Sequence, residues 1–244
     1  MVDERRGALD GAVQGVRRVL FQVPVLHRLT RGVLALGFRG SAAYWERRYT
    51  AGGNSGDGSY GRLAAFKAQV LNDFVAEQGV RSVIEFGCGD GAQLALASYP
   101  RYVGLDVART AVRMCAERFA GDDTRSFFVY DPAGFFDRGG LLRADLAMSL
   151  DVIYHLVEDE TFDGYMRHLF GAAERFVAVY SSNAPVSDPA PHVRHRRFTD
   201  WVEANQPGWK LLRHVANPHP ARGDNGSSTA DFYFYARTPA ASPA

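Results

Sequence analysis

The feature that most constrains the fold is an alternation of short apolar runs with amphipathic stretches between residues 82 and 180. The apolar runs have the length of buried strands and lie at 82–86, 102–105, 126–130, 146–150 and 176–180. The stretches between them have the three-and-four spacing of helices, at 91–98, 108–119 and 161–172. Strands and helices that alternate in this way predict a parallel sheet covered by helices on both faces.

Further elements flank this core. Residues 60–78 carry apolar side chains at helical spacing, and the following Gly79 suits the C-terminal cap of that helix. After Arg196 the pattern changes to a helix and then to two strands, at 209–215 and 231–236. We therefore expect an α/β fold: a doubly wound, seven-stranded, mostly parallel sheet with an antiparallel C-terminal hairpin strand, and helices on both faces.

The composition divides the chain into three segments. Residues 1–58 predict an N-terminal helical cap and a glycine-rich lid loop over 40–60, residues 59–237 the α/β domain, and residues 238–244 a disordered tail. The basic, apolar stretch 12–37 predicts two short helices broken at Pro24. We expect this cap to pack on the domain or on a second copy in a homodimer; the alternative is a peripheral membrane contact.

The bulk composition excludes several classes of protein. The net charge is +1, which gives no reason to expect a nucleic-acid partner. The two cysteines, Cys88 and Cys115, are typical of buried residues in a reducing cytoplasm rather than of a disulfide framework. Arginines and histidines interrupt the apolar N-terminal stretch, so neither a transmembrane helix nor a secretory signal is expected there.

A glycine-rich turn follows the first strand of the core. Gly87, Gly89 and Gly91 let the backbone turn tightly and approach a ligand, and the helix expected after them would favour an anionic group. Asp106 ends the second strand, where a carboxylate can accept both hydroxyls of a ribose. This spacing also fits a dinucleotide fingerprint, so an NAD(P)-dependent oxidoreductase remains an alternative.

Three features favour another cofactor. Glu85 precedes the first glycine by two positions, the motif lies some 80 residues into the chain, and the last strand is the aromatic segment Phe232–Tyr235. With these, Glu85–Gly91 resembles the first motif of the class I (Rossmann-like) S-adenosylmethionine-dependent methyltransferases, and Gly104–Val107 resembles the second. Tyr130-Asp131 and Ser149–Leu156 are similar to their third and fourth motifs, so the resemblance covers about residues 60–180.

The resemblance implies S-adenosyl-L-methionine as cofactor. In that family the glycine loop wraps the methionine part, so Asp106 would hold the ribose and Asp131 the adenine amino group. The residues expected to bind the cofactor on this basis are Tyr60, Arg62, Glu85, Phe86, Gly87, Cys88, Gly89, Asp106, Val107, Asp131, Ser149 and Leu150.

The candidate base is a histidine just after the fourth strand. His155 should border the transferred methyl group, and a hydroxyl acceptor must lose its proton to a base, a role that suits histidine near neutral pH. Asp151 lies one helical turn earlier, where its carboxylate could orient the ring. The alternative interpretation is that His155 packs against the cofactor or caps a helix without taking a proton.

A second cluster follows the fifth strand at 191–197. His192 and His195 are alternative bases, whereas Arg194 and Arg196 could grip a phosphate, a carboxylate or sugar hydroxyls. Tyr154 is assigned to the same acceptor site. The alternative is a solvated basic turn. No metal site is assigned, because Asp151, His155, His192 and Asn183 could converge but lack tight ligand spacing, and metal use stays an open alternative.

The function predicted from the sequence is therefore S-adenosylmethionine-dependent O-methylation of a sugar or glycan hydroxyl, by in-line displacement with a histidine base. The setting would be a bacterial sugar, polysaccharide or natural-product pathway in the cytoplasm. Three alternatives remain: N- or C-methylation of a similar small-molecule acceptor, the oxidoreductase, and a non-catalytic relative that binds the cofactor.

Overall fold

The structure is a computed structural model that describes residues 40–185, 190, 192–220 and 227–238. The helices expected within 12–37 and the tail at 239–244 lie outside the described residues.

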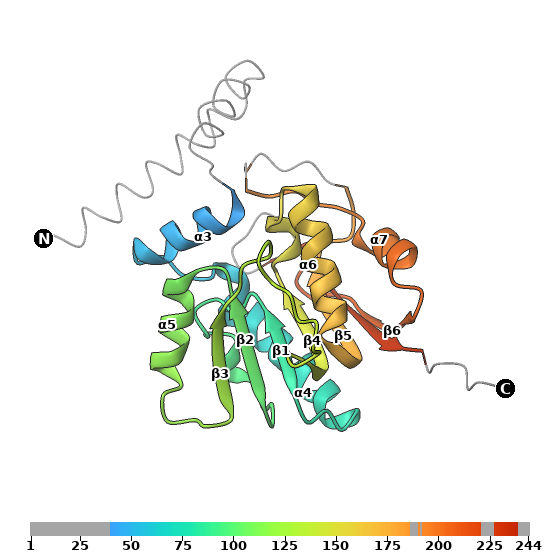
Figure 1. Ribbon diagram of the computed structural model, residues 1–244, viewed down its shortest axis with the longest axis horizontal. Helices are drawn as coiled ribbons and strands as arrows, with labels where there is room; N and C mark the ends of the chain where they lie inside the picture. Colours follow the sequence, from blue (N-terminus) through green and yellow to red (C-terminus); the bar gives the residue numbers. More distant parts are fainter. Residues whose placement is uncertain (1–39, 186–189, 191, 221–226, 239–244) are drawn as a thin grey trace, which may run out of the picture.

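A single seven-stranded sheet forms the centre of the fold, in the order β3-β2-β1-β4-β5-β7-β6 (Figure 1). Strand β7 runs antiparallel to both of its neighbours, and the other adjacent pairs are parallel. The predicted sheet, with its antiparallel hairpin strand, is thereby confirmed. The strands are β1 (Val83–Phe86), β2 (Tyr102–Asp106), β3 (Arg125–Val129), β4 (Ala144–Leu150), β5 (Ala173–Ser181), β6 (Trp209–Val215) and β7 (Asp231–Arg237).

The burial of each strand follows its place in the sheet. All seven residues of β4 and all four of β1 are buried, as expected of central parallel strands covered on both faces. The edge strands are more exposed to solvent. Phe128 and Val129 on β3, and Leu211 and Leu212 on β6, are about half exposed. β1 and β4 are therefore the most buried strands, and their carboxyl ends support the cleft described below.

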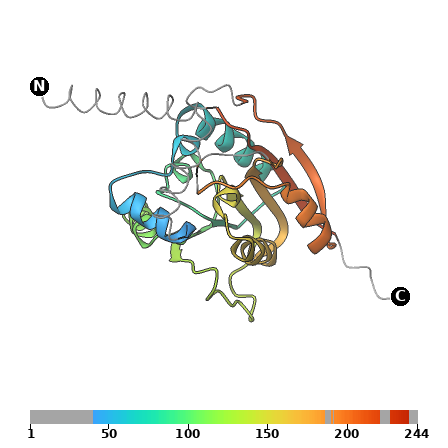
Figure 2. The ribbon, with the colours of Figure 1, turned by 90° about the horizontal axis from the view of Figure 1, so that it is seen from above.

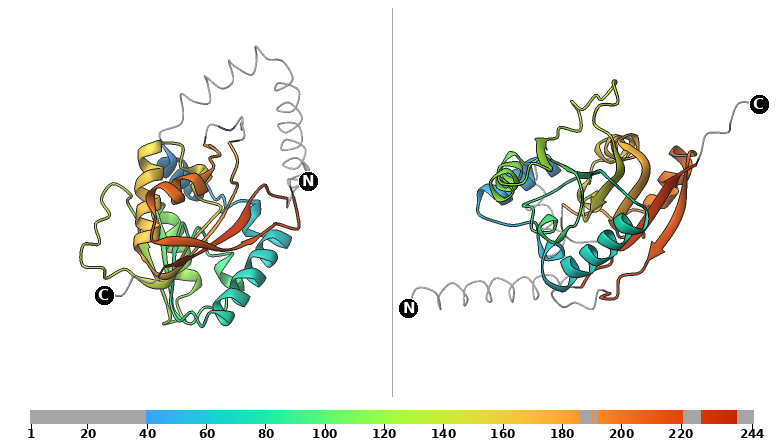
Figure 3. Two further views of the ribbon diagram at one scale, coloured as in Figure 1. Left: turned by 90° about the vertical axis from the view of Figure 1, so that its right-hand side faces the viewer. Right: turned by 90° about the horizontal axis from the view of Figure 1, so that it is seen from below.

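Helices cover both faces of the sheet, as Figures 2 and 3 show. On one face, α4 (Gly61–Glu77) and α5 (Arg109–Arg118) share a core with the even positions of β4, through residues such as Phe74 and Cys115, and α5 itself lies over β2 and β3. On the other face, α6 (Asp159–Gly171) and α7 (Phe198–Asn205) pack through residues such as Met166 and Phe198. Each helix has its apolar stripe on the sheet, so the sheet lies between two cores.

The expected loop at 40–60 is partly wrong. Residues Ser41–Thr50 form a helix, α3, and the irregular segment begins only at Ala51. Gly40 (φ 94°) precedes this helix and Gly52 (φ 80°) follows it, so both glycines lie outside the helix and do not interrupt it. In Figure 1, α3 lies at the end of the sheet where β1, β2 and β4 terminate.

The helix expected at 91–98 is also wrong, because only a 3₁₀ turn, Leu94–Leu96, forms there. Asn72 of α4 captures the chain just beyond it, donating to the carbonyl of Leu96 at 3.0 Å and accepting from the amide of Ser98 at 2.8 Å. Pro100 follows and cannot donate a helical hydrogen bond. No long helix dipole therefore stands behind the glycine turn.

None of the helices within the described ranges has the length and apolar character needed to cross a bilayer.

Candidate active site

A cleft that opens to solvent lies over the carboxyl ends of β1, β2 and β4. This is the place where an open α/β sheet reverses its strand order and binds ligands. Helix α3 contributes Ser41, Ala42, Trp45 and Tyr49 to the lining. The rest of the lining comes from Ser55, Ser59, Lys67, Glu85, Gly87, Cys88, Gly89, Gln93, Asp106, Val107, Tyr130, Pro132, Leu150, Asp151, Val152, His155, Leu156, Thr161 and Tyr165.

The glycine turn forms one wall of the cleft and leaves no room for side chains. Gly87 has φ 90° and Gly89 has φ 59°, both in the left-handed region that glycine adopts freely. A Cβ on Gly87 would collide with the side chain of Val152, and one on Gly89 with the hydroxyl of Ser55. Val152 and Ser55 therefore pack directly against the backbone of the turn, and positions 87 and 89 both require glycine.

Asp106, at the end of β2, is held beside this turn by two backbone amides. Its Oδ2 accepts from the amide of Gly89 at 2.9 Å, and its Oδ1 accepts from that of Ala108 at 2.8 Å. Burial raises the pKa of Asp106 to about 6, although the two amide hydrogen bonds oppose the shift. The carboxyl group thus faces the cleft fixed in position and poised to ionise fully when a donor or a cation arrives.

Glu85 is a second buried carboxyl group in the same cleft. It accepts a hydrogen bond from the hydroxyl of Tyr102 at 2.6 Å. Burial raises the pKa of Glu85 to about 7, against the lowering effects of Tyr102 and of the nearby ammonium of Lys67. Two neighbouring carboxyl groups with raised pKa values are typical of a functional site rather than of a packed core.

Asp90 fastens the segment after α3 to the glycine turn. It accepts the hydroxyl of Tyr60 at 2.6 Å and the amide of Ser55 at 3.0 Å, while its own amide donates to the Ser55 hydroxyl at 2.9 Å. These hydrogen bonds hold the pKa of Asp90 below its ordinary value, despite burial. Tyr60, expected to bind cofactor, is therefore bonded to the turn itself, and Arg62 is exposed on α4.

The remaining residues expected to bind cofactor divide into two groups. Cys88, Val107 and Leu150 line the cleft. Phe86 is fully buried beneath it, and Ser149 accepts a hydrogen bond from Tyr165 in the core, so neither side chain lines the cleft. Asp131 is exposed outside the lining, and its carboxylate accepts the amide of Ala133 at 3.0 Å.

His155 lines the cleft from a 3₁₀ turn, Ile153–His155, and its ring is tightly surrounded. Its Nδ1 lies 3.0 Å from the carbonyl oxygen of His192, so this nitrogen carries the proton and Nε2 carries the lone pair. The edge of Trp45 packs against the ring, with 5.0 Å between centroids. Burial lowers the pKa of His155 to about 4, so the imidazole is neutral near pH 7.

Asp151 does not orient His155, contrary to the expectation from the sequence. Its Oδ2 lies 2.7 Å from the ammonium of Lys67, and its Oδ1 accepts the hydroxyl of Tyr154 at 3.0 Å. Lys67 was not expected at this site; its signal in the sequence is a lysine on the apolar stripe of α4, four residues from both Leu63 and Leu71. Tyr154, assigned to the acceptor site, serves this carboxylate and lies outside the cleft lining.

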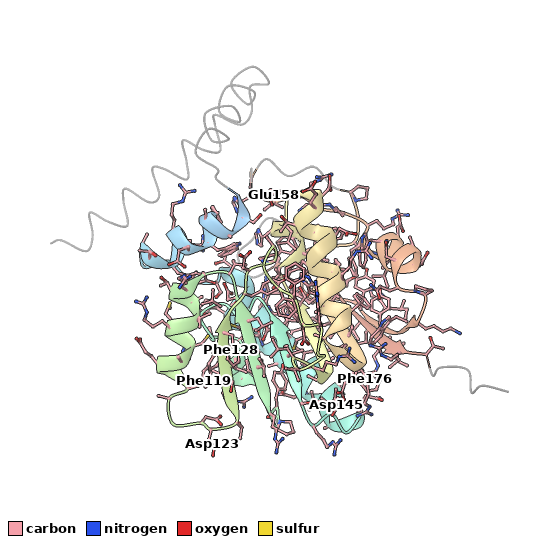
Figure 4. All side chains as sticks on the ribbon, viewed as in Figure 1. Phe119, Asp123, Phe128, Asp145, Glu158 and Phe176 are labelled. Carbon is pink, nitrogen blue, oxygen red and sulfur yellow. The ribbon has the colours of Figure 1, made fainter. Side chains whose placement is uncertain are left out.

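The segment 192–197 is bonded to the start of α6. Arg194 and Arg196 both pair with Asp159, at 3.0 and 2.9 Å, and Arg196 donates to the carbonyl of Leu156 at 2.6 Å. Ser41 of α3 reaches the same place, donating to Glu158, which Figure 4 labels beside α3. Neither arginine lines the cleft, so the structure does not bring the two guanidinium groups expected to grip the acceptor to it.

The two histidines of this segment, His192 and His195, do not line the cleft. The ring of His192 stacks on Tyr44 at 4.3 Å and lies parallel to His155 at 5.6 Å. His195 Nδ1 is 2.5 Å from the hydroxyl of Ser182. Within the described ranges, no three His, Cys, Asp or Glu side chains converge as metal ligands.

The aromatic residues of α3 are the other part of the site that the sequence analysis did not assign. Trp45 and Tyr49 form the roof of the cleft, and Ser41 ties the helix to the carbonyl of His155 at 2.6 Å. At its other end, Glu46 accepts the hydroxyl of Thr110 on α5 at 2.7 Å. The signal was the aromatic cluster Tyr44-Trp45, too apolar for an exposed linker.

Comparison with known proteins identifies the fold. No protein-family model and no curated protein matches the chain. The N-methyltransferase NodS from Bradyrhizobium japonicum WM9, in complex with S-adenosylhomocysteine, matches with a TM-score of 0.57 and 17% identity, over 73% of this chain and 88% of that one. Magnesium protoporphyrin IX methyltransferase (ChlM) from Synechocystis PCC 6803, also with bound S-adenosylhomocysteine, matches with a TM-score of 0.56 and 16% identity, over 72% and 85%.

The methyltransferase domain of a bacterial Hen1 protein matches with a TM-score of 0.55 and 18% identity, over 70% of this chain and 97% of the domain. These proteins differ in what they methylate, so what they share with this chain is the architecture. The chain has the fold of the class I S-adenosylmethionine-dependent methyltransferases.

Proposed function

We propose that this protein is an S-adenosylmethionine-dependent methyltransferase. The observation that carries the proposal is Asp106, a buried carboxyl group aimed into the cleft and fixed by the amide of Gly89 on the glycine turn. A carboxylate at the end of the second strand is where this architecture can accept both hydroxyls of a ribose. The strand order supports the proposal, because the dinucleotide fold of an oxidoreductase has the order 3-2-1-4-5-6, without an antiparallel β7.

The charge and shape of the cleft fit this cofactor. Among the described residues, the lining contains three carboxyl groups, on Glu85, Asp106 and Asp151, against the single ammonium of Lys67. A cationic sulfonium nearby would favour the ionised forms of Glu85 and Asp106, whose pKa values burial has raised. Gly87 and Gly89 line the same cleft, where their backbone would border the methionine part.

The residues also divide the cleft into regions of suitable chemistry. Val107, Tyr130 and Pro132 provide apolar and aromatic surface beyond Asp106, as a purine requires. When bound, S-adenosylmethionine supplies a methyl group that is already strongly electrophilic. The protein then has to hold an acceptor in line and exclude water, and such alignment contributes about 7–11 kcal/mol in favourable cases. Trp45 and Tyr49 of α3 cover the cleft and limit the access of water.

The finer proposal is transfer to a hydroxyl group of a sugar or another small glycan, with His155 as the proton acceptor. Its Nε2 carries the lone pair, and its ring is neutral near pH 7. A pKa of about 4 makes it a weak base, so we expect a contribution near the lower end of the 10²–10⁴-fold range of such groups. The ring of Trp45 beside it offers an apolar face for the C–H side of a sugar.

The alternative with N- or C-methylation predicts a different response to substitution. An amine acceptor needs no strong base, so His155→Gln would leave its rate nearly unchanged. A hydroxyl acceptor should lose about 10²-fold in kcat, with little change in KM for the cofactor. Transfer of an isotopically labelled methyl group to panels of glycosides and amines distinguishes these two outcomes. Intact cofactor binding without transfer to either panel would favour the non-catalytic relative.

Cofactor binding is tested by thermal unfolding of the whole chain with S-adenosylhomocysteine or NAD. At 100 times its Kd, a ligand stabilises the folded state by about 2.7 kcal/mol, or roughly 5–10 °C for a domain of this size. We expect this rise with S-adenosylhomocysteine and none with NAD. Asp106→Ala should abolish it, whereas Asp123→Ala, an exposed residue that Figure 4 labels at the opposite end of the sheet, should keep it. A rise with NAD alone would overturn the proposal.

A further inference from the structure

A buried lysine in the wall of the cleft has no part in the proposed chemistry. The chain has only two lysines, Lys67 and Lys210, among its 28 Lys and Arg residues. Lys210 is exposed on β6, whereas Lys67 on α4 is 1% exposed. Removing an ammonium from water is costly unless it is paired, so this placement requires a partner and suggests a use.

The partner of Lys67 is a carboxylate whose two oxygens are both bonded. Asp151 Oδ2 lies 2.7 Å from the ammonium, and Oδ1 accepts the hydroxyl of Tyr154 at 3.0 Å. The ammonium also lies 5.3 Å from the centre of the Tyr180 ring, within the range of a cation–π contact. A Cβ on Gly58 would lie only 2.6 Å from Oδ2, so the glycine lets the chain close over the ion pair. Residues from α4, β5 and the end of β4 therefore meet at one carboxylate.

The backbone at this carboxylate is unusual. Asp151 has φ 58°, and among the described residues no other non-glycine residue has a positive φ. The left-handed conformation costs about 1–2 kcal/mol, although Asp tolerates it better than most residues. Its amide donates to the carbonyl of Tyr180 at 2.9 Å, and the chain then turns out of β4. This turn leads directly to Val152, which contacts Gly87, and to the 3₁₀ turn that carries His155.

We propose that Lys67 is a positioning residue: by holding the carboxylate of Asp151 in its left-handed turn, it sets Val152 against the glycine turn and His155 in the cleft. The inference rests on the proposed function in one respect, namely that His155 and the glycine turn serve methyl transfer and cofactor binding. Lys67 itself acts through Asp151. Without the ammonium, the carboxylate, which is only 15% exposed, would lose its charge partner and keep the hydrogen bond from Tyr154, which favours its rotation toward water and the opening of the turn.

Four variants of the full-length protein test this role: Lys67→Met, Asp151→Asn, the double variant, and Lys210→Met as the matched control on the exposed lysine. One readout is the affinity for S-adenosylhomocysteine by calorimetry. The other is the titration of the His155 ring, followed by NMR of ¹⁵N-histidine-labelled protein and assigned with His155→Gln. The charged and titratable groups that act on this ring are Asp151, His192 and His195, and the last two remain in every variant.

Lys67→Met should weaken binding by about tenfold or more, equivalent to ~1.4 kcal/mol. It should also move the His155 titration upward from about 4 toward its ordinary value of 6.5, as the opened turn admits water. The double variant removes both charges while Asn keeps the left-handed backbone accessible, so it should recover most of both properties. Lys210→Met should match the wild type.

If the ion pair is purely structural, Lys67→Met will have a lower melting temperature, but its ligand affinity and its His155 titration will equal those of Lys210→Met. This result would overturn the inference. If Lys67→Met does not fold, Asp151→Asn and the double variant carry the same comparison: failure of the double variant to improve on Asp151→Asn contradicts the proposal. Should the wild type not bind S-adenosylhomocysteine, the proposed function fails, but the His155 titration still tests the positioning role.

Discussion

The substitution Asp106→Asn should make the protein more stable near neutral pH while it impairs ligand binding. Burial raises the pKa of Asp106 from 3.8 to about 6. Above this pKa, keeping the carboxylate ionised in the folded state costs about 3 kcal/mol, at ~1.4 kcal/mol for each tenfold change in proton affinity. Asparagine removes this cost but can accept only one of the two amide hydrogen bonds, from Gly89 or from Ala108, which costs about 1–2 kcal/mol.

The pH dependence of the effect follows from the sign of the shift. Because the folded protein binds this proton more tightly than the unfolded chain, its stabilising contribution is complete below pH 3.8 and is lost as the pH rises through about 6. Wild type should therefore lose stability relative to Asp106→Asn, by about 2 kcal/mol between roughly pH 4.5 and 7.5. The variant should be more stable by about 1–2 kcal/mol at the upper end.

Urea unfolding of both proteins across this pH range measures the difference directly, because the contributions of all other groups cancel between them. A difference that stays constant with pH, or a wild type that gains on the variant as the pH rises, would refute the reasoning. It would mean that Asp106 is already ionised at little cost in the unliganded protein, and that the cleft does not hold it poised for a donor.

Two further substitutions test the site from other sides. Gly89→Ala should lower the free energy of unfolding by about 2–4 kcal/mol, because alanine is strained in the left-handed backbone and its Cβ collides with Ser55. Urea unfolding should show this loss, whereas the control Gly121→Ala, whose Cβ meets no neighbouring atom, should be nearly as stable as the wild type. Equal stability of the two variants would contradict the geometry. The folded pKa of His155 is lowered to about 4, so wild type loses stability as the pH falls below 6.5. Between pH 8 and about pH 5, the free energy of unfolding of His155→Gln should therefore rise by about 2 kcal/mol relative to that of the wild type. A difference that stays constant with pH would show that the ring is solvated.

The sheet could be predicted from the sequence because its signal is local. Runs such as Val83–Phe86 are apolar, short and separated by helical periodicity, and the central strands are buried on both faces. The helix at 91–98 failed for a reason that is not local. Its residues have helical spacing, but the side chain of Asn72, some 25 residues away, takes the hydrogen bonds that a longer helix would have used.

The site was predictable where residue type and strand end coincide. Asp106 ends β2 and Gly89 lies in the turn after β1, so their meeting in the cleft could be foreseen. Lys67 could not be assigned in the same way, because a lysine in an amphipathic helix is ordinarily solvated. Asp151 was expected to orient a histidine from spacing alone, whereas the buried ammonium competes for its carboxylate and takes it.

Direct calorimetry of S-adenosylhomocysteine binding to the whole chain tests the central claim, that this cleft holds S-adenosylmethionine. We predict one site per chain, no competition by excess NAD, and loss of the binding heat in Asp106→Ala but not in Asp123→Ala. Absence of binding to the folded wild type, displacement of the ligand by NAD, or binding that Asp106→Ala leaves unchanged would contradict it.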